Sequence, residues 1–122
     1  WVDAGICIYS NKKPPSISFP NIEKLNNLPK DKFIYSSSNN SCISDKFFIK
    51  GKYYSNHHVS GNYILHKSII NKFAVLYKKY LKLIDKNDIW TDQVILTLMY
   101  KDNKDLFYKY CDGYGILCQK LF

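Results

Sequence analysis

The clearest pattern in the chain is a helical repeat of hydrophobic residues between Ser68 and Ile84. These residues recur every three or four positions, which places them on one broad face of a helix, with most of the lysines outside it. They are Ile69, Ile70, Phe73, Ala74, Leu76, Tyr77, Tyr80, Leu81 and Ile84. Ser68 is the natural N-cap, because a serine hydroxyl accepts a hydrogen bond from a first-turn N–H group. We therefore predict an amphipathic helix over about residues 68–85.

A second amphipathic helix is predicted over about residues 91–102, where Thr91 or Asp88 can cap the first turn. Its apolar face is formed by Val94, Ile95, Leu98 and Met99. Asp92 and Gln93 occupy the first turn. An acid is favourable there because the helix dipole leaves partial positive charge at its N-terminus, so Asp92 has a structural role available, contributing under about 1 kcal/mol.

Shorter apolar runs predict strands on both sides of these helices. The candidate strands are residues 1–9, 33–35, 45–54 with a break at Gly51, and 106–111, followed by an Asp112-Gly113 turn and a return segment over 116–122. The serine-rich run 36–41 predicts a polar loop, and residues 22–25 fit one helical turn. Strands interleaved with helices predict an α/β fold with a short mixed sheet.

Composition indicates one folded domain. Hydrophobic residues make up 46% and aromatic residues 16% of the 122 residues, which is too many for a disordered segment. The net charge of +8 would suit phosphate binding. However, the 18 basic residues are all lysine, they are spread along the chain, and an AT-rich coding bias accounts for them. Arginine, which makes bidentate phosphate and guanine contacts, is absent, so we do not expect a nucleic-acid partner.

The four cysteines, Cys7, Cys42, Cys111 and Cys118, match no zinc pattern, because none of them forms a CxxC pair. Disulfides and buried free thiols both fit an even count, and free thiols are favoured. No stretch reaches the roughly 18 consecutive apolar residues of a membrane span, so we expect none.

Three short segments contain candidate site residues. Asp3 interrupts the apolar run 1–9, and an ionised carboxylate there needs a partner, so it either caps a turn at the strand end or serves a function. Gly61 and Asn62 tolerate turn conformations, so the backbone there can approach a ligand closely. Trp90 precedes the second helix, where it can form a wall for a sugar or a base, or act as a hydrophobic staple.

The adjacent histidines His57 and His58 suggest a metal site at first sight. Neighbouring side chains on a strand point to opposite faces, so two such residues rarely bind one ion together. We therefore predict surface histidines.

Three segments taken together are similar to one known class of protein. They are WVDAGI (1–6), SGNYILHKSIINKFAVLYKKYL (60–81) and IWTDQVILTLMYKDNKDLFYKY (89–110). In this order they resemble the carboxy-terminal half of glycosyltransferase-like proteins of the bacterial and viral HtrL/YibB type. Those proteins have a W-hydrophobic-D-A-G segment on a central strand, a small-residue turn entering a helix, and an acid–Gln pair opening the next helix. The resemblance covers most of residues 1–8 and 59–114.

The resemblance implies a partial GT-A-like domain that transfers a sugar from a nucleotide-diphospho sugar to a hydroxyl of a carbohydrate or protein acceptor. Asp3 would bind Mn²⁺ or Mg²⁺, which prefer hard oxygen ligands. Gly61 and Asn62 would line the donor or acceptor pocket, and Trp90 would stack on a ring. Asp92 would be the general base, with Gln93 as its hydrogen-bonding neighbour.

The same resemblance makes residues 1–122 a single domain that is the carboxy-terminal part of such an enzyme. GT-A enzymes place their nucleotide-binding βαβ units before the strand that WVDAG resembles, so we expect catalysis to need sequence upstream of Trp1. Because this segment has one carboxylate, either other ligands complete the metal site or metal use is lost. The alternative hypotheses are a non-catalytic interaction domain that keeps the fold and, after it, a small basic nucleic-acid-binding protein.

Overall fold

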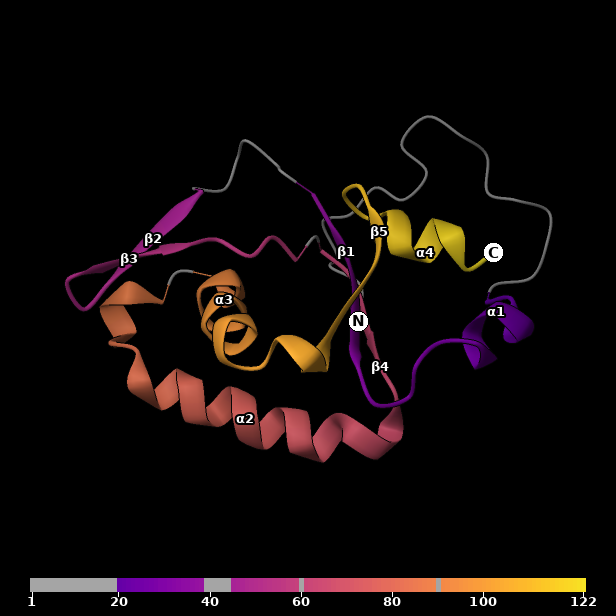
Figure 1. Cartoon of the computed structure of the whole chain (residues 1–122), viewed down its shortest axis with the longest axis horizontal. Helices are drawn as coiled ribbons and strands as arrows, with labels where there is room; N and C mark the ends of the chain where they lie inside the picture. The colour runs from indigo at the N-terminus through magenta and orange to yellow at the C-terminus, as the bar shows by residue number, and fades with distance from the viewer. Residues whose placement is uncertain (1–19, 39–44, 60, 90) are drawn as a thin grey trace.

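The computed structural model describes residues 20–38, 45–59, 61–89 and 91–122 (Figure 1). Its helices are α1 (Ile22–Asn26), α2 (Ile70–Leu83), α3 (Asp92–Asp102) and α4 (Ile116–Lys120), with short 3₁₀ helices at Lys67–Ile69, Lys86–Asp88 and Lys104–Leu106. Its strands are β1 (Phe33–Ser37), β2 (Lys46–Ile49), β3 (Lys52–Ser55), β4 (Tyr63–Leu65) and β5 (Phe107–Asp112). The strand predicted over residues 1–9 lies outside the described residues.

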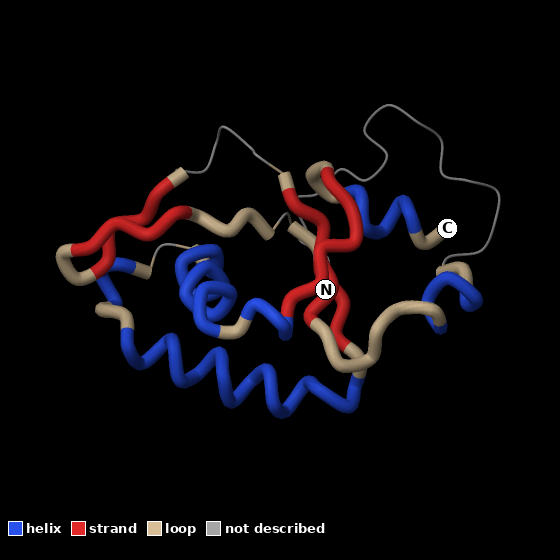
Figure 2. Tube along the Cα trace, in the orientation of Figure 1, coloured by secondary structure: helices blue, strands red, loops and turns tan. Residues whose placement is uncertain are grey.

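A mixed three-stranded sheet has the order β4-β1-β5. β1 pairs antiparallel with β4, with Ile34 opposite Ile64, and parallel with β5, with Ile34 opposite Tyr108. A register shift follows Tyr35 in the β1–β5 pair. The predicted α/β class with a short mixed sheet is therefore confirmed, and Figure 2 shows this sheet between helices on either side.

The central strand β1 is buried on both faces, so the molecule has a helical layer on each side of the sheet. Phe33 and Tyr35 face the larger core, which includes residues of α2 and α3. Ile34 points the other way, into a smaller core with Leu117 and Leu121 from the α4 end of the chain. A strand covered on both faces has no polar alternation, which is why β1 begins as an unbroken apolar run. Ser36 and Ser37, predicted as loop, complete this strand.

Strands β2 and β3 form a separate antiparallel hairpin, in which Phe47 pairs with Tyr54 and Phe48 with Tyr53. The predicted break at Gly51 is its turn. Lys50 and Gly51 have φ angles of 47° and 78°, and two consecutive positive φ values are typical of the tight turns that match the twist of a hairpin.

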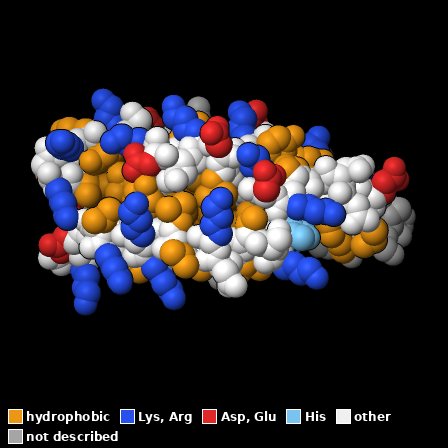
Figure 3. Space-filling view, turned by 60° about the horizontal axis from the view of Figure 1, so that its bottom comes forward, with side chains coloured by type: hydrophobic (Ala, Val, Ile, Leu, Met, Phe, Trp, Pro, Cys, Tyr) orange, Lys and Arg blue, Asp and Glu red, His pale blue; other side chains and the backbone are white. Residues whose placement is uncertain are grey.

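Helix α2 confirms the strongest sequence prediction, although its start differs. The predicted cap at Ser68 is wrong: a 3₁₀ turn precedes the helix, and the N–H of Ser68 instead donates to the His66 Nδ1 at 3.2 Å. α2 itself has Ile69 at its N-cap position, with no side-chain cap. Its buried stripe is narrower than predicted, because Ile70 and Leu81 are exposed. Figure 3 shows lysines standing among hydrophobic side chains on one face of the molecule.

Helix α3 is more deeply buried than predicted, and helix α4 replaces a predicted return segment. α3 begins after its predicted cap Thr91, but five consecutive residues from Gln93 to Thr97 are buried, so this half of the helix is enclosed rather than amphipathic. The return segment over 116–122 is largely the helix α4, which starts after Gly115 in a left-handed conformation with φ of 70°. A glycine with this φ reverses the chain direction without steric strain.

Candidate functional site

The Gly61 turn leads into β4 through a backbone conformation that favours glycine. Gly61 has a φ of 57°, in the left-handed region where a side chain would introduce strain. The predicted turn is therefore confirmed. It is half-buried, and Asn62, the next residue, begins the return to the sheet.

Asn62 is enclosed by the fold, with 0% of its surface exposed. Its Oδ1 accepts a hydrogen bond from the Ser36 hydroxyl of β1 at 3.3 Å, and its Nδ2 donates to the Cys118 sulfur of α4 at 3.6 Å. An amide buried without such partners would cost about 1–3 kcal/mol. The side chain therefore ties the Gly61 turn to β1 and α4, and its contact with a substrate stays a prediction.

Gln93 makes two hydrogen bonds to the backbone of one residue, Val59. Its Oε1 accepts from the Val59 N–H at 3.0 Å, and its Nε2 donates to the Val59 carbonyl at 2.5 Å. Both residues are buried. A primary amide offers one acceptor and a pair of donors, so it can satisfy a backbone N–H and carbonyl as a neighbouring strand would. This amide clamp holds the chain just before the Gly61 turn against α3.

Thr97 extends the same attachment one helical turn further. Its hydroxyl accepts from the His57 N–H at 3.0 Å and donates to the Asn56 side chain at 3.2 Å. Residues four apart on a helix are separated by about 6 Å along its axis, which nearly equals the distance between alternate residues of an extended chain. Gln93 and Thr97 are therefore spaced to bind Val59 and His57.

Asp92, the first residue of α3, is exposed beside this clamp. The Thr91 hydroxyl donates to its Oδ1 at 3.2 Å and accepts from the Gln93 N–H at 3.4 Å. Burial raises the pKa of Tyr63 and of Tyr77, and the nearby Asp92 carboxylate raises both further. The two phenols therefore keep their protons at neutral pH beside a carboxylate that solvent can reach.

His57 is the residue that the sequence interpretation placed wrongly, because its ring is packed among aromatic side chains. It stacks on Tyr100 with 3.4 Å between ring centroids and 5° between planes, and its Nε2 lies 2.5 Å from the Tyr35 hydroxyl. Burial lowers the pKa of His57 to about 4, and the positive charges of His58 and Lys109 add to this effect. The ring is therefore neutral at physiological pH.

His58 has different partners from its neighbour, in agreement with side chains that point apart. Its Nε2 lies 3.5 Å from the Asp45 carboxylate, its Nδ1 lies 3.3 Å from the Asn56 amide, and its side chain is only 10% exposed. Neither histidine is a surface residue, so that prediction is wrong. The signal that could have found them is the aromatic content around the pair, because a histidine between tyrosines has rings to pack against.

The described residues do not by themselves form a site for a divalent cation. Within the described ranges no group of three or more His, Cys, Asp or Glu side chains lies close enough to hold a metal ion. Asp92 supplies one carboxylate next to the clamp, and hard cations need several oxygen ligands. Asp3, the predicted ligand, and Trp90, the predicted stacking residue, lie outside the described residues, so their roles stay predictions. Cys118 is a buried free thiol, as favoured, and Cys111 is a half-buried one, while Cys7 and Cys42 lie outside the described residues.

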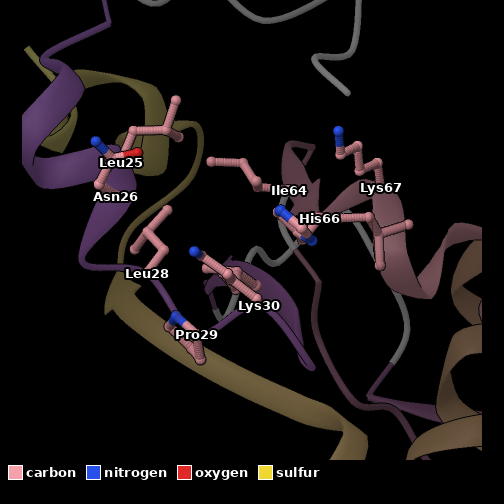
Figure 4. Close-up of a pocket in the computed structure, with 10 residues that line it drawn as sticks. Leu25, Asn26, Leu28, Pro29, Lys30, Ile64, His66 and Lys67 are labelled. Carbon is pink, nitrogen blue, oxygen red and sulfur yellow. The ribbon is translucent and has the colours of Figure 1, made fainter.

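A hollow of about 360 Å³ beside β4 is separate from all of these predicted residues. Figure 4 shows Leu25 and Leu28 from the α1 region on one side, and Ile64 and His66 from the β4 region on the other. Lys30 and Lys67 also line it. None of the candidate site residues that the structure describes lines it.

Comparisons with protein-family models, with curated proteins and with solved structures found no match to the chain. Within the part that the structure describes, no helix is both long and apolar enough to cross a membrane.

Proposed function

We propose that this chain acts in glycosyl transfer as part of a GT-A-like domain, and that the Gly61 turn and the start of α3 form one wall of its sugar-nucleotide site. The observation that supports this is the amide clamp between Gln93 and Val59. It holds the two predicted segments beside each other although the whole of α2 separates them in sequence. It also leaves Asp92, next to the clamp, exposed to solvent.

In the proposed reaction the acceptor hydroxyl attacks the anomeric carbon of the donor sugar. The bond from this carbon to the diphosphate oxygen breaks, the diphosphate leaves with the electron pair, and Asp92 takes the hydroxyl proton. Asp92 suits this role because solvent reaches it and it lies near the Tyr63 and Tyr77 phenols, which remain protonated donors for sugar hydroxyls. Mn²⁺ or Mg²⁺ bound through Asp3 would neutralise the departing diphosphate.

Gln93 has a different part in this proposal from the one first predicted. Its amide is engaged by the Val59 backbone, so it acts as a positioning residue that fixes the Gly61 turn relative to Asp92. Asn62 acts in the same way from the other side, through Ser36 and Cys118. The ligand-facing groups are then the Gly61 backbone and the Asp92 carboxylate.

The test is a thermal-shift screen of nucleotide-diphospho sugars against the full-length protein, with any sequence upstream of Trp1 included, in the presence and absence of Mn²⁺. A ligand at a hundred times its dissociation constant stabilises the native state by about 2.7 kcal/mol, so a true donor raises the Tm by several degrees. We expect Asp92→Asn to keep donor binding and to lose sugar transfer. Asp105→Asn, which changes an exposed acid in the first turn of another helix, is the matched control. No stabilisation by any donor, or wild-type transfer by Asp92→Asn, would contradict the proposal.

The second candidate is a non-catalytic interaction domain, and one observation favours it. The two predicted amides, Asn62 and Gln93, are both buried, and both form hydrogen bonds within the fold. These side chains therefore have a structural role that needs no ligand. If this candidate is correct, no nucleotide-diphospho sugar in the screen raises the Tm. The same experiment therefore separates the two.

A further inference from the structure

A groove of about 420 Å³ lies between the β3 strand of the hairpin and the second half of α3, at the opposite end of that helix from Asp92. Its lining comes from two segments far apart in sequence. The lining residues are Lys52, Tyr53, Tyr54, Ser55, Thr97, Tyr100, Lys101 and Lys104. Three lysines and three tyrosines therefore share one groove, although lysine is spread along the sequence.

The charge of this groove has a single sign. Among the described residues that line it, none is acidic, while Lys52, Lys101 and Lys104 are each exposed. A cluster of one sign attracts polyanions and raises their rate of association. The ligand that complements this surface is therefore anionic.

Two of the three lysines are held over aromatic rings. The Lys101 ammonium lies 5.1 Å from the centroid of the Tyr54 ring, and the Lys104 ammonium lies 5.9 Å from that of Tyr100. Such cation–π contacts are worth about 0.5–1 kcal/mol at exposed sites and restrict where each charge can be. The Tyr100 ring is itself stacked on His57, which fixes its plane. The Lys101 and Lys104 ammonium groups are therefore held over rings, at the end of α3 and in the 3₁₀ helix that follows it.

The third tyrosine presents its ring to solvent on the outer face of the hairpin, because neighbouring side chains of a strand point to opposite faces and Tyr54 is the one that contacts Lys101. Tyr53 is 73% exposed, and its ring lies 4.9 Å from that of Phe48 on the neighbouring strand, which is 57% exposed. Exposing two neighbouring aromatic rings to water is unfavourable, and such pairs are typical of a place where another flat group stacks.

We propose that single-stranded nucleic acid binds along this groove, with its phosphates on Lys52, Lys101 and Lys104 and with one base crossing the edge of β3 to stack on Tyr53. A duplex keeps its base faces inside the stack, so it cannot use the exposed rings, whereas a single strand offers both faces and phosphates together. Lysine gives point charges without the fixed fork of arginine, so binding is expected to be independent of base sequence. This proposal is independent of glycosyl transfer, because it uses none of the residues around Asp92.

The experiment measures the fluorescence anisotropy of a labelled oligo(dT) strand of about 12 nucleotides, enough to cover one such groove, as the full chain is added. The comparison probes are a duplex of the same length, a strand of the same length made of abasic sites, and an oligoglutamate peptide. We expect saturable binding of oligo(dT) that is tighter than that of all three probes.

Two substitutions separate the stacking from the charges. Tyr53→Ala is expected to weaken oligo(dT) binding about fivefold to a hundredfold and to leave the abasic strand unchanged. Lys101→Gln is expected to weaken both strands and to reduce the slope of log K against log salt by about 0.7. Tyr108→Ala, at a tyrosine of β5 that is 44% exposed, and Lys79→Gln, at a lysine 5.7 Å from the Tyr80 ring on α2, are matched controls that should change nothing.

Several results would overturn the proposal. Equal binding of the abasic strand or of oligoglutamate would mean that the groove is a general polyanion surface. If Lys101→Gln and Lys79→Gln lose the same affinity for oligo(dT), the charge of the whole molecule, and not this groove, attracts the strand. Absence of saturable binding at low salt would also contradict it.

Discussion

The two long helices, α2 and α3, pack against each other and differ in what surrounds them. α2 buries Phe73 and Tyr80 and exposes residues such as Val75, which is 71% exposed. α3 buries six residues, including the polar Gln93 and Thr97. A helix buried on one side needs only a correct hydrophobic stripe, whereas an enclosed helix needs a specific partner for each side chain. Asp92 and Gln93 are accordingly on α3, and Gln93 attaches the chain before the Gly61 turn to this helix.

The largest expected effect is a core truncation on α3. Met99 is fully buried, so Met99→Ala should lower the free energy of unfolding by about 2–5 kcal/mol through lost burial and the cavity that remains. Val75→Ala on α2 should change it by less than about 0.5 kcal/mol, because this side chain is largely in water. Urea denaturation of both variants gives the two values. If the two variants lose similar free energies of unfolding, the difference in burial between α2 and α3 has no energetic consequence.

The next effect concerns the amide clamp. Gln93→Leu keeps the size of the side chain but leaves the buried Val59 N–H and carbonyl without their partner, which should cost about 2–4 kcal/mol. Hydrogen exchange of the Val59 amide should become faster than that of its neighbours in the core. Asn71→Leu, which replaces an exposed amide on α2, is the control and should leave stability within about 0.5 kcal/mol of the wild type. A Gln93→Leu variant as stable as the control would show that the clamp is dispensable.

The smallest effect is a pH dependence from His57. Its pKa falls from an ordinary value of about 6.5 to about 4 in the folded protein, so the unfolded chain binds more protons between these values. The contribution of His57 to stability is therefore fully present above pH 6.5 and is lost as the pH falls towards 4. Because the ring is half-buried and partly screened by water, we expect a loss on the order of 1 kcal/mol between pH 7 and pH 5.

Denaturation curves at both pH values, for the wild type and for His57→Gln, measure this contribution. The variant has no imidazole to protonate, so its stability should fall less over the same interval. If the two proteins lose the same stability, other groups cause the pH dependence and the buried environment of His57 is not responsible.

Periodicity predicted α2 and the position of α3 because both helices have an apolar repeat that any folded context would bury. It failed for the details that depend on tertiary contacts. Ser68 was expected to cap α2, yet His66 accepts its N–H in a 3₁₀ turn instead. The segment over 116–122 was expected to return after the Asp112-Gly113 turn, and it forms α4 because Leu117 and Leu121 pack under Ile34.

The candidate site was predictable only in part, for a related reason. Asp92 could be identified from its place in the first turn of a helix, and Gly61 from its turn chemistry, since both are local features. The partners of Asn62 and Gln93 come from β1, α4 and the chain before the Gly61 turn, so no local pattern indicates them. The groove at Tyr53 was missed because Lys52 and Lys101 are close only in the folded chain.

The parallel pairing of β1 with β5 has a consequence for how the protein folds. β1 is the first described strand and β5 the last, so the central strand obtains its second neighbour only when nearly the whole described chain is available. Contacts between segments so distant in sequence form slowly, because closing a long loop costs entropy before any pairing is gained. The β2–β3 hairpin, whose strands are joined by Lys50 and Gly51 alone, can form within microseconds. On a ribosome the hairpin and α2 therefore assemble early, and closure of the sheet waits for the emergence of β5.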